Sequence, residues 1–341
     1  MEKKYGFFLL GLLILITILV ITILGKSLAS DGSIVIRFSH VVAQNTPKGW
    51  GAREFARRVN QELRGKVRVE VFANGSLYQD NEAIEALAAG DLEMAAPSSA
   101  KFMGIVPALQ LFDMPFLFSD IQSVHTTIDG AIGEEMKELF LNRNLDIRLL
   151  TFWDNAFKQF TCNVRPLLSP DDFKGLKFRI MSSDVLDAQM KSLGATGLRL
   201  PFQEVYKVLA KDLVDGQENT ASNIYTGNFH EVQQYLTFSN HGYLGYVVII
   251  NDTFWQKLPK HIQNKLTVIM DEVTLEVRKK AQELDIQQSE LIRAYAKIHD
   301  HPGITTLNES QKKMLQKAMI PVYQKFSCIV PERWISRIKN M

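Results

Sequence analysis

The chain has 341 residues, of which 46% are hydrophobic and 22% charged, a usage that excludes extended disorder and suits about two globular domains. Lys and Arg number 39 against 37 Asp and Glu, so the chain is nearly neutral and carries no electrostatic footprint for nucleic acid. Two cysteines exclude a disulfide scaffold and a four-thiolate zinc site.

Residues 1–30 have the order of a secretory signal peptide. Lys3 and Lys4 precede an apolar run from Tyr5 to Leu24, and the small residues that follow predict cleavage after Ala29. The run of 20 residues is also long enough to cross a bilayer as an uncleaved N-terminal membrane anchor. Both interpretations predict that the body of the protein is exported to the periplasm.

The body opens with alternating strand and helix signals. Strands are indicated where apolar and polar residues alternate, and helices where a cap precedes apolar residues three or four positions apart. In chain order we expect a strand at 34–41, a helix from the Thr46–Pro47 cap to about 63, a strand at 66–72, a helix at 80–89 that stops at Gly90, and an extended segment at 92–96. This order is typical of βαβ units and a mainly parallel sheet.

The pattern resumes after Leu150. We expect a strand at 175–180, helices at 184–193 and 202–211, and a buried, nearly all-apolar strand at 242–250. From Pro259 to about His299 no further Pro or Gly occurs, and apolar residues recur at helical spacing, which predicts one very long helix. A helix of that length indicates two α/β lobes with a bridging helix between them.

The familiar catalytic and metal-binding motifs are missing from the sequence. It has no G-x-S-x-G, H-E-x-x-H, C-x-x-C, phosphate-binding loop or G-x-G-x-x-G. The missing motifs do not exclude an enzyme, but none of the familiar chemistries has a candidate site; the expectation of a binding protein without cofactor, metal or turnover comes from the resemblance described below. Cys162 and Cys328 lie far apart in the chain, which favours two unpaired thiols, although an oxidising compartment would permit a disulfide.

Seven segments of the body stand in a characteristic order and spacing. They are N-T-P-K-G (45–49), F-D-M-P-F-L-F (112–118), F-K-G-L-K-F-R-I (173–180), P-F-Q-E-V-Y (201–206), V-D-G-Q-E-N-T (214–220), S-N-I-Y-T-G-N-F (222–229) and S-N-H-G-Y-L-G-Y (239–246). Together they resemble the periplasmic solute-binding proteins of TRAP transporters, the exported receptors of tripartite, ion-driven uptake systems. The resemblance covers about 34 to 330 and is greatest to the branch that binds the four-carbon dicarboxylates malate, succinate and fumarate.

The resemblance implies a two-lobed periplasmic-binding-protein-like fold, with a mostly parallel sheet and flanking helices in each lobe, closing on the ligand around a hinge. Lobe I would comprise 31–156 and 245–284, and lobe II 157–244 and 285–341 with the C-terminal helices. The partners implied are a small dicarboxylate and the membrane subunits of a TRAP permease.

Arg179 and Lys158 are the first two candidate ligand contacts. The resemblance implies that Arg179 binds a carboxylate, which a guanidinium can do through two parallel hydrogen bonds. From sequence alone, a surface arginine paired with a local acid is an equal alternative. Lys158, in N-A-F-K-Q-F, stands where much of the family has arginine within G-F-R, and it would contact a single oxygen.

Amide and aromatic candidates follow. The resemblance implies that Asn219 contacts the ligand and that Phe202 lines the cleft. Asn223 would share a face with Asn219 if the segment is helical. Glu218 is expected to be structural, because an unpaired carboxylate in an anion site would repel the ligand.

The first lobe supplies the remaining cations. Lys48 falls in the first turn of the first helix, where the helix N-terminus favours an anion. We expect Arg179 and Lys158 to hold one carboxylate of a diacid, and Lys48 and Lys101 to hold the other. The last candidates are His40, at the end of the first strand where α/β sheets place their ligand crevice, and His241 and Tyr243, which flank the return to the first lobe.

Three alternatives stay open. The same fold could bind a keto acid, sugar acid or aromatic acid, with Lys158 and Ala221 as the positions at which the pocket could differ. The protein could instead be sensory and present its ligand to a membrane kinase. It could also be an exported enzyme that turns over an acid.

Overall fold

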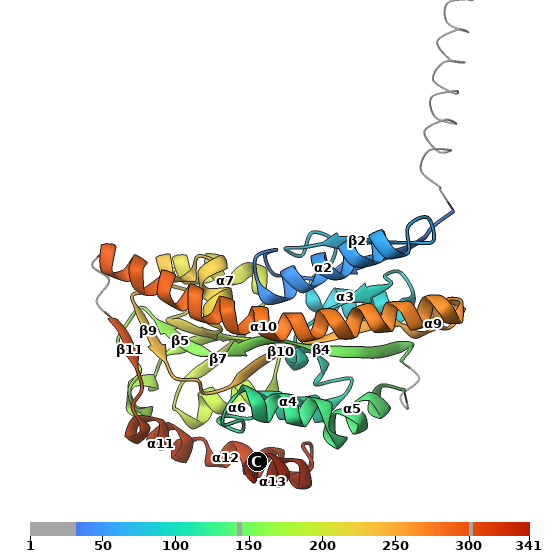
Figure 1. The fold of residues 1–341 in the computed structure, drawn as a ribbon. Helices are drawn as coiled ribbons and strands as arrows, with labels where there is room; N and C mark the ends of the chain where they lie inside the picture. The colour runs from blue at the N-terminus through green and yellow to red at the C-terminus, as the bar shows by residue number, and fades with distance from the viewer. Residues whose placement is uncertain (1–31, 142–144, 300–302) are drawn as a thin grey trace, which may run out of the picture.

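Two lobes lie side by side, and one long helix, α10 (Lys260–Ile298), crosses both (Figure 1). The computed structural model describes residues 32–141, 145–299 and 303–341. The predicted signal or anchor segment lies outside the described residues. The two-lobed α/β architecture expected from the sequence is confirmed.

The first lobe is built on a five-stranded sheet in the order β2-β1-β3-β10-β4. Its strands are β1 (Ile34–Ser39), β2 (Val67–Phe72), β3 (Met94–Ala95), β4 (Ile147–Phe157) and β10 (Tyr243–Asn251). Its helices are α2 (Pro47–Glu62), α3 (Asp80–Ala89), α4 (Ile121–Asp129), α5 (Ala131–Leu141) and α9 (Asp252–Lys257), with 3₁₀ turns η1 (Ser99–Phe102) and η2 (Pro107–Asp113).

The ends of α2 and α3 follow from local chemistry. The Thr46 hydroxyl accepts the N–H of Gly49 at 3.1 Å, so the cap expected from the sequence is present. Helix α3 stops at Gly90, which has a left-handed φ of 81° that a side chain would disfavour. The Thr46 cap places Lys48 in the first turn of α2, and the N–H of Gln79, which donates to Glu82 Oε2 at 2.9 Å, marks the start of α3 at Asp80.

The second lobe is built on a six-stranded sheet in the order β11-β9-β5-β8-β6-β7. Its strands are β5 (Gln159–Cys162), β6 (Lys177–Ile180), β7 (Thr196–Arg199), β8 (Gly216–Asn219), β9 (Tyr235–Phe238) and β11 (Gly303–Thr306). Its helical segments are η3 (Pro170–Phe173), α6 (Asp184–Ser192), η4 (Phe202–Glu204), α7 (Val205–Ala210), α8 (Ala221–Thr226) and η5 (Phe229–Glu231). The helix expected at 202–211 therefore begins as a 3₁₀ turn.

Both sheets combine parallel and antiparallel pairs, and in the second sheet β11 also pairs in parallel with β9. Strand β1 pairs in parallel with β2 and β3, and β6 with β7 and β8. Strand β10 is antiparallel to β3 and β4, and β5 is antiparallel to β8 and β9. The antiparallel pairs arise because β4 continues almost directly into the second lobe as β5 while β10 runs back into the first.

That crossing forms the connection between the lobes. Lys158 alone separates β4 from β5, and its backbone N–H donates to the carbonyl of Gly242 on the returning segment at 2.7 Å. A Cβ at residue 242 would lie 2.9 Å from Lys158 Cε, so only glycine fits beside the lysine. The lobe boundaries expected from the sequence stay a prediction.

Helix α10 matches the long helix expected from the absence of Pro and Gly. Its buried residues follow helical spacing, with Leu266, Ile269, Val273 and Val277 facing α2 and β4 of the first lobe. Ile292, about four turns further on, packs into the second lobe. One continuous helix thus belongs to the cores of both lobes.

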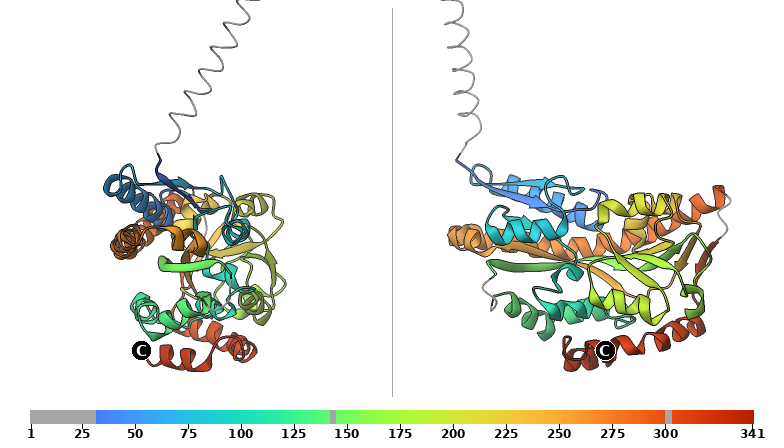
Figure 2. Two further views of the ribbon diagram at one scale, coloured as in Figure 1. Left: turned by 90° about the vertical axis from the view of Figure 1, so that its right-hand side faces the viewer. Right: turned by 180° about the vertical axis from the view of Figure 1, so that it is seen from behind.

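The C-terminal helices form a separate layer on the opposite side of the molecule from α2 and α3 (Figures 1 and 2). They are α11 (Glu309–Ala318), α12 (Ile320–Phe326) and α13 (Glu332–Lys339). Trp334 Nε1 donates to Glu135 of α5 at 3.0 Å, and Trp334, Ile335 and Ile338 are buried. This layer contacts elements of both lobes.

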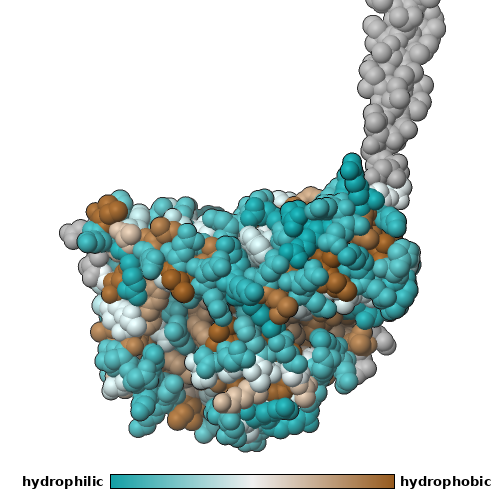
Figure 3. Space-filling model, viewed as in Figure 1, coloured by the Kyte–Doolittle hydropathy of each residue, from teal (hydrophilic) through white to brown (hydrophobic). Residues whose placement is uncertain are grey.

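The surface seen in Figure 3 is mostly hydrophilic, with apolar residues scattered over it. Within the described ranges, no helix combines the length and apolarity needed to span a membrane. Cys162 is buried and Cys328 is exposed, and both thiols are free.

Candidate functional site

A cavity lies between the lobes. It is lined by three cationic side chains, one carboxylate, two amides and a mixture of aromatic and aliphatic groups. The first lobe contributes Val41, Val42, Lys48, Asp80, Ser98, Lys101, Leu244 and Tyr246, and the second contributes Arg179, Met181, Phe202, Asn219 and Asn223. Six of the ten predicted site residues therefore meet in one cavity.

Arg179, on β6, is the cation of the second lobe. Its side chain is 1% exposed, and Nε and Nη2 donate to the carbonyl oxygen of Leu200 at 3.0 and 2.8 Å. These two bonds hold the guanidinium plane in place and leave its other N–H groups for a ligand. Burial lowers the pKa of Arg179 to about 10, so it stays charged at neutral pH.

Lys48, in the first turn of α2, is fully buried. Its Nζ donates to the carbonyl oxygen of Ala96 at 2.8 Å and lies 3.9 Å from the centre of the Tyr246 ring. Burial lowers the pKa of Lys48 to about 8, because the charged form has lost most of its hydration. An anion in the cavity would stabilise the charged form of Lys48 in place of the hydration lost on burial.

Lys101, on η1, completes the cations. Burial lowers its pKa, and the nearby carboxylate of Asp80 opposes that shift. Asp80 begins α3 and acts electrostatically on Lys48, Lys101 and Arg179. Among the described residues, none of these three cations forms an ion pair with a carboxylate. The lining therefore has three positive charges against one negative charge.

The amides sit where a strand turns into a helix. Asn219 ends β8 and Asn223 lies in α8. The segment is therefore not helical throughout, which the expectation of a shared helix face required. The two amides nevertheless contact each other, with Asn223 Nδ2 donating to Asn219 Oδ1 at 2.8 Å. Thr220 caps α8 between them, and this turn directs both amides toward the cavity.

Lys158 and His241 lie outside the cavity lining, in a buried network at the crossing. Lys158 Nζ donates to Glu218 Oε1 at 2.8 Å, and His241 Nε2 contacts Glu218 Oε2 at 2.8 Å. Burial raises the pKa of Glu218, but Lys158 and His241 outweigh it, so the net pKa is lowered. Glu218 is thus paired, as expected of a structural residue, and the charge of Lys158 is already satisfied without a ligand.

Tyr243 and His40 also lie apart from the lining. The Tyr243 hydroxyl donates to Asp154 at 2.6 Å, and Asp154 contacts His125 Nε2 at 2.5 Å on its other oxygen. His40 is buried behind Lys48, and burial together with the charge of Lys48 lowers its pKa to about 3. Of the ten predicted site residues, the structure therefore sets Lys158, His40, His241 and Tyr243 outside the cavity.

Sequence reasoning missed Tyr246, Ser98 and Asp80. The signal for Tyr246 was present, because alternate residues of a strand point to opposite faces. In β10, Leu244 and Tyr246 line the cavity, whereas Tyr243 faces Asp154 on the other side. Asp80 had no such signal, since an acidic residue in the first turn of a helix is ordinarily explained by the helix dipole.

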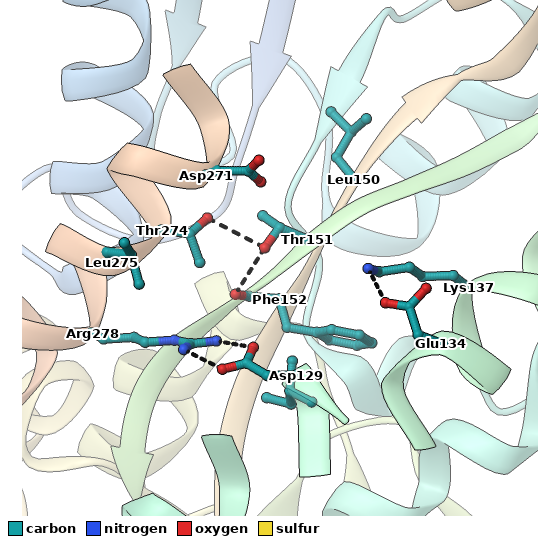
Figure 4. A pocket seen from close by; sticks show the side chains of 11 residues that line it. Asp129, Glu134, Lys137, Leu150, Thr151, Phe152, Asp271, Thr274, Leu275 and Arg278 are labelled. Carbon is teal, nitrogen blue, oxygen red and sulfur yellow. Dashed lines mark hydrogen bonds and ion pairs between the residues drawn. The ribbon is translucent and has the colours of Figure 1, made fainter. Parts of the chain in front are cut away.

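A second hollow, of about 780 Å³, lies between α10, α4, α5 and β4 (Figure 4). Its two cations are already paired: Arg278 donates to both oxygens of Asp129 at 2.7 and 2.6 Å, and Lys137 to Glu134 at 2.7 Å. It offers no free cation to a carboxylate. In the part of the chain that the structure describes, no cluster of His, Cys, Asp or Glu could hold a metal ion.

Comparison with known proteins agrees with this geometry. The family model described as "Bacterial extracellular solute-binding protein, family 7" matches residues 38–328. The chain belongs to this family. The C4-dicarboxylate-binding protein DctB of Bacillus subtilis is 42% identical over 308 residues, which is 90% of this chain and 86% of that protein.

Solved structures of related solute-binding proteins have the same fold. The TRAP periplasmic solute-binding protein of Sulfurospirillum deleyianum, with bound succinate, has a TM-score of 0.86 and 43% identity, covering 90% of this chain and 98% of that one. The Pseudomonas aeruginosa protein with bound L-malate has a TM-score of 0.81 and 38% identity, covering 86% and 99%. This solute-binding protein therefore shares its architecture with receptors that hold small diacids.

Proposed function

We propose that this solute-binding protein is the extracytoplasmic receptor of a TRAP-type transporter and binds a four-carbon dicarboxylate such as malate, succinate or fumarate in the cavity between its lobes. The single observation that carries the proposal is the set of three buried or half-buried cations, Lys48, Lys101 and Arg179, that have no carboxylate partner. The proposal includes binding without turnover or cofactor.

The charge of the lining supports a doubly ionised ligand. Lys48, Lys101 and Arg179 carry three positive charges, and Asp80 carries one negative charge. A dicarboxylate dianion would neutralise the excess, whereas a monocarboxylate would leave buried charge uncompensated, which is costly. The cations also come from both lobes, so a diacid would bridge Arg179 on one side and the two lysines on the other.

Each polar group has a plausible role in this arrangement. Arg179 would bind one carboxylate through parallel hydrogen bonds, and Asn219 would donate to the same end. Lys48 and Lys101 would hold the second carboxylate, and Phe202 would cover the carbon chain. Outside the cytoplasm, the protein with its lobes closed on the ligand would then dock on a membrane permease.

The test measures binding of succinate, L-malate and fumarate by calorimetry, with butyrate and succinamate as monoanion controls. We expect the dianions to bind and the monoanions to bind at least tenfold more weakly, because an uncompensated charge remains. Arg179→Ala should weaken succinate binding roughly 100-fold, through loss of charge-assisted hydrogen bonds. Arg179→Lys, which keeps the charge but cannot form two parallel bonds, should lose roughly tenfold.

The matched control is Arg57→Ala, which removes an exposed arginine that pairs with Glu54 on the surface of α2. It should leave the affinity unchanged. Binding of succinate that survives Arg179→Ala would contradict the assigned site, and a well-folded protein that ignores all three dianions would contradict the assigned ligand. Chemical change of bound succinate on incubation would favour an enzyme instead.

A further inference from the structure

The charge of this protein is distributed unevenly along its chain. Residues 31–308 contain 29 Lys and Arg against 34 Asp and Glu, whereas residues 309–341 contain seven against two. The second segment folds as α11, α12 and α13, the layer along the lower side of the molecule in Figure 1. The C-terminal helices therefore carry an excess of five positive charges in a nearly neutral protein.

This basic layer contains a hollow of about 890 Å³. Its wall is aromatic and apolar, formed by Pro115, Phe116, Tyr323 and Ile320. The Tyr323 hydroxyl donates to the carbonyl oxygen of Pro115 at 2.7 Å, which fastens α12 to the 112–118 segment. Ile320 is 51% exposed, so the wall offers an apolar contact to solvent.

Three lysines, Lys313, Lys317 and Lys339, line the same hollow. All three are exposed, and none forms an ion pair within the described ranges. Lys339 Nζ instead lies 4.0 Å from the centre of the Tyr323 ring. Some exposed lysines of the second lobe are paired with an acid, as Lys191 is with Asp187. The three lysines of the hollow place positive charge beside an apolar wall.

The wall also contacts the crossing between the lobes. Phe116 has a left-handed φ of 52°, which is strained for a bulky side chain, and its N–H donates to the carbonyl oxygen of His241 at 2.8 Å. His241 belongs to the buried network of Lys158 and Glu218 at that crossing. A group that packs on Phe116 therefore touches a residue bonded directly to the connection between the lobes.

We propose that the hollow lined by Lys313, Lys317 and Lys339 is a docking site for an acidic segment of a partner protein. The lysines bind its carboxylates, and Phe116, Tyr323 and Ile320 receive an apolar side chain. We commit to a protein segment because its carboxylates are complementary to the three lysines and its apolar side chain to the wall of a hollow. Through Phe116 and His241, docking responds to closure of the lobes.

The test uses fluorescence anisotropy of a labelled twelve-residue peptide of alternating Glu and Leu, with a Gln–Leu peptide as the neutral match. The protein is expressed from its complete coding sequence. We expect the acidic peptide alone to bind, with an affinity that falls as salt rises. The double variant Lys313→Glu/Lys317→Glu should bind it at least tenfold more weakly.

The matched control is Lys66→Glu/Lys211→Glu, which makes the same charge change at two exposed lysines far from the hollow. It should bind the peptide within twofold of the unmodified protein. Should the double reversal disturb folding, Lys313→Ala and Lys317→Ala, made singly, are expected to give smaller losses in the same direction. Succinate at saturation should change the peptide affinity at least threefold, and the peptide should change the succinate affinity by the same factor.

Several results would overturn the proposal. Equal loss in both double variants would mean non-specific attraction between charges. Binding to phosphatidylglycerol vesicles but not to the peptide would assign the face to a membrane. Peptide binding without any effect of succinate would reject the link to closure. The peptide measurements need no ligand, so their failure is distinct from failure of the proposed dicarboxylate function.

Discussion

At the residue scale, the cavity is defined by cations whose hydrogen-bonding partners are carbonyl oxygens rather than carboxylates. Lys48 donates to Ala96 and Arg179 to Leu200, so both are oriented but neither is neutralised. Lys158, by contrast, is neutralised by Glu218. Lys48, Arg179 and Lys158 are all buried. Lys48 and Arg179 are available to an anion because their partners are carbonyl oxygens, whereas Lys158 is not, because its partner is a carboxylate.

The lowered pKa of Lys48 predicts how binding depends on pH. In the empty cavity its pKa is about 8, and a bound carboxylate would raise it, so the complex takes up a proton above that pH. We expect succinate affinity to be constant from about pH 6 to 7.5 and to fall by up to tenfold per pH unit above about pH 8. Calorimetry across this range checks the prediction.

Lys48→Arg is the matched variant, because arginine stays protonated throughout the range. It should bind succinate with an affinity that no longer falls between pH 8 and 9, below the pKa of about 10 of Arg179. A fall of the same size in this variant would assign the titration to another group.

At the element scale, the chain crosses between the lobes where β4 leads into β5 and again where the segment before β10 returns. One buried ion pair lies at this crossing. Lys158 follows β4 directly, Glu218 lies in β8, and His241 precedes β10, so the network joins three segments. The Phe160 ring stacks on the His241 ring with centroids 3.6 Å apart, which excludes water from the pair. Such a pair is costly to break, because a lone buried charge remains.

We therefore expect Lys158→Met to destabilise the protein by about 3–5 kcal/mol. Urea unfolding at pH 7 measures this change. Lys174→Met removes an exposed lysine paired with Asp171 and should cost less than about 1 kcal/mol. Equal losses in the two variants would show that burial of the Lys158 pair adds nothing. A larger loss of succinate affinity than of stability would return Lys158 to the ligand site.

At the scale of the whole molecule, the lobes touch around the cavity through few polar contacts. Ser98 Oγ lies 3.4 Å from Met181 Sδ, and Gln203 Nε2 donates to the Val41 carbonyl at 3.2 Å. Closing the cavity brings Arg179 toward Lys48 and Lys101, which repel one another without an anion. A bound diacid would replace this repulsion with attraction to the three cations and would favour the closed form.

This balance predicts a ligand-dependent change of shape. The radius of gyration from small-angle X-ray scattering should decrease when succinate is added to the protein. Arg179→Ala should show no decrease at the same succinate concentration, and Arg57→Ala should behave as the unmodified protein does. A radius that stays constant on saturation would mean that the cations do not govern closure.

Local sequence determined the elements, because their signals are short in range. Thr46 and Pro47 start α2, Gly90 ends α3, and the stretch without Pro or Gly after Pro259 yields α10. The helix start at Thr46 was enough to nominate Lys48 as an anion-binding residue. The role expected of Arg179 came from the resemblance to TRAP solute-binding proteins, because local sequence left a surface arginine as an equal alternative.

Only the tertiary structure decided which charges are free. Lys158 and Glu218 are 60 residues apart and meet because β5 and β8 pair, which no local pattern indicates. The alternation of β10 placed Tyr246, not Tyr243, in the cavity, and the turn after β8 brought Asn219 and Asn223 into contact. A cation binds a ligand only where folding gives it no carboxylate partner, and that pairing depends on contacts between distant segments.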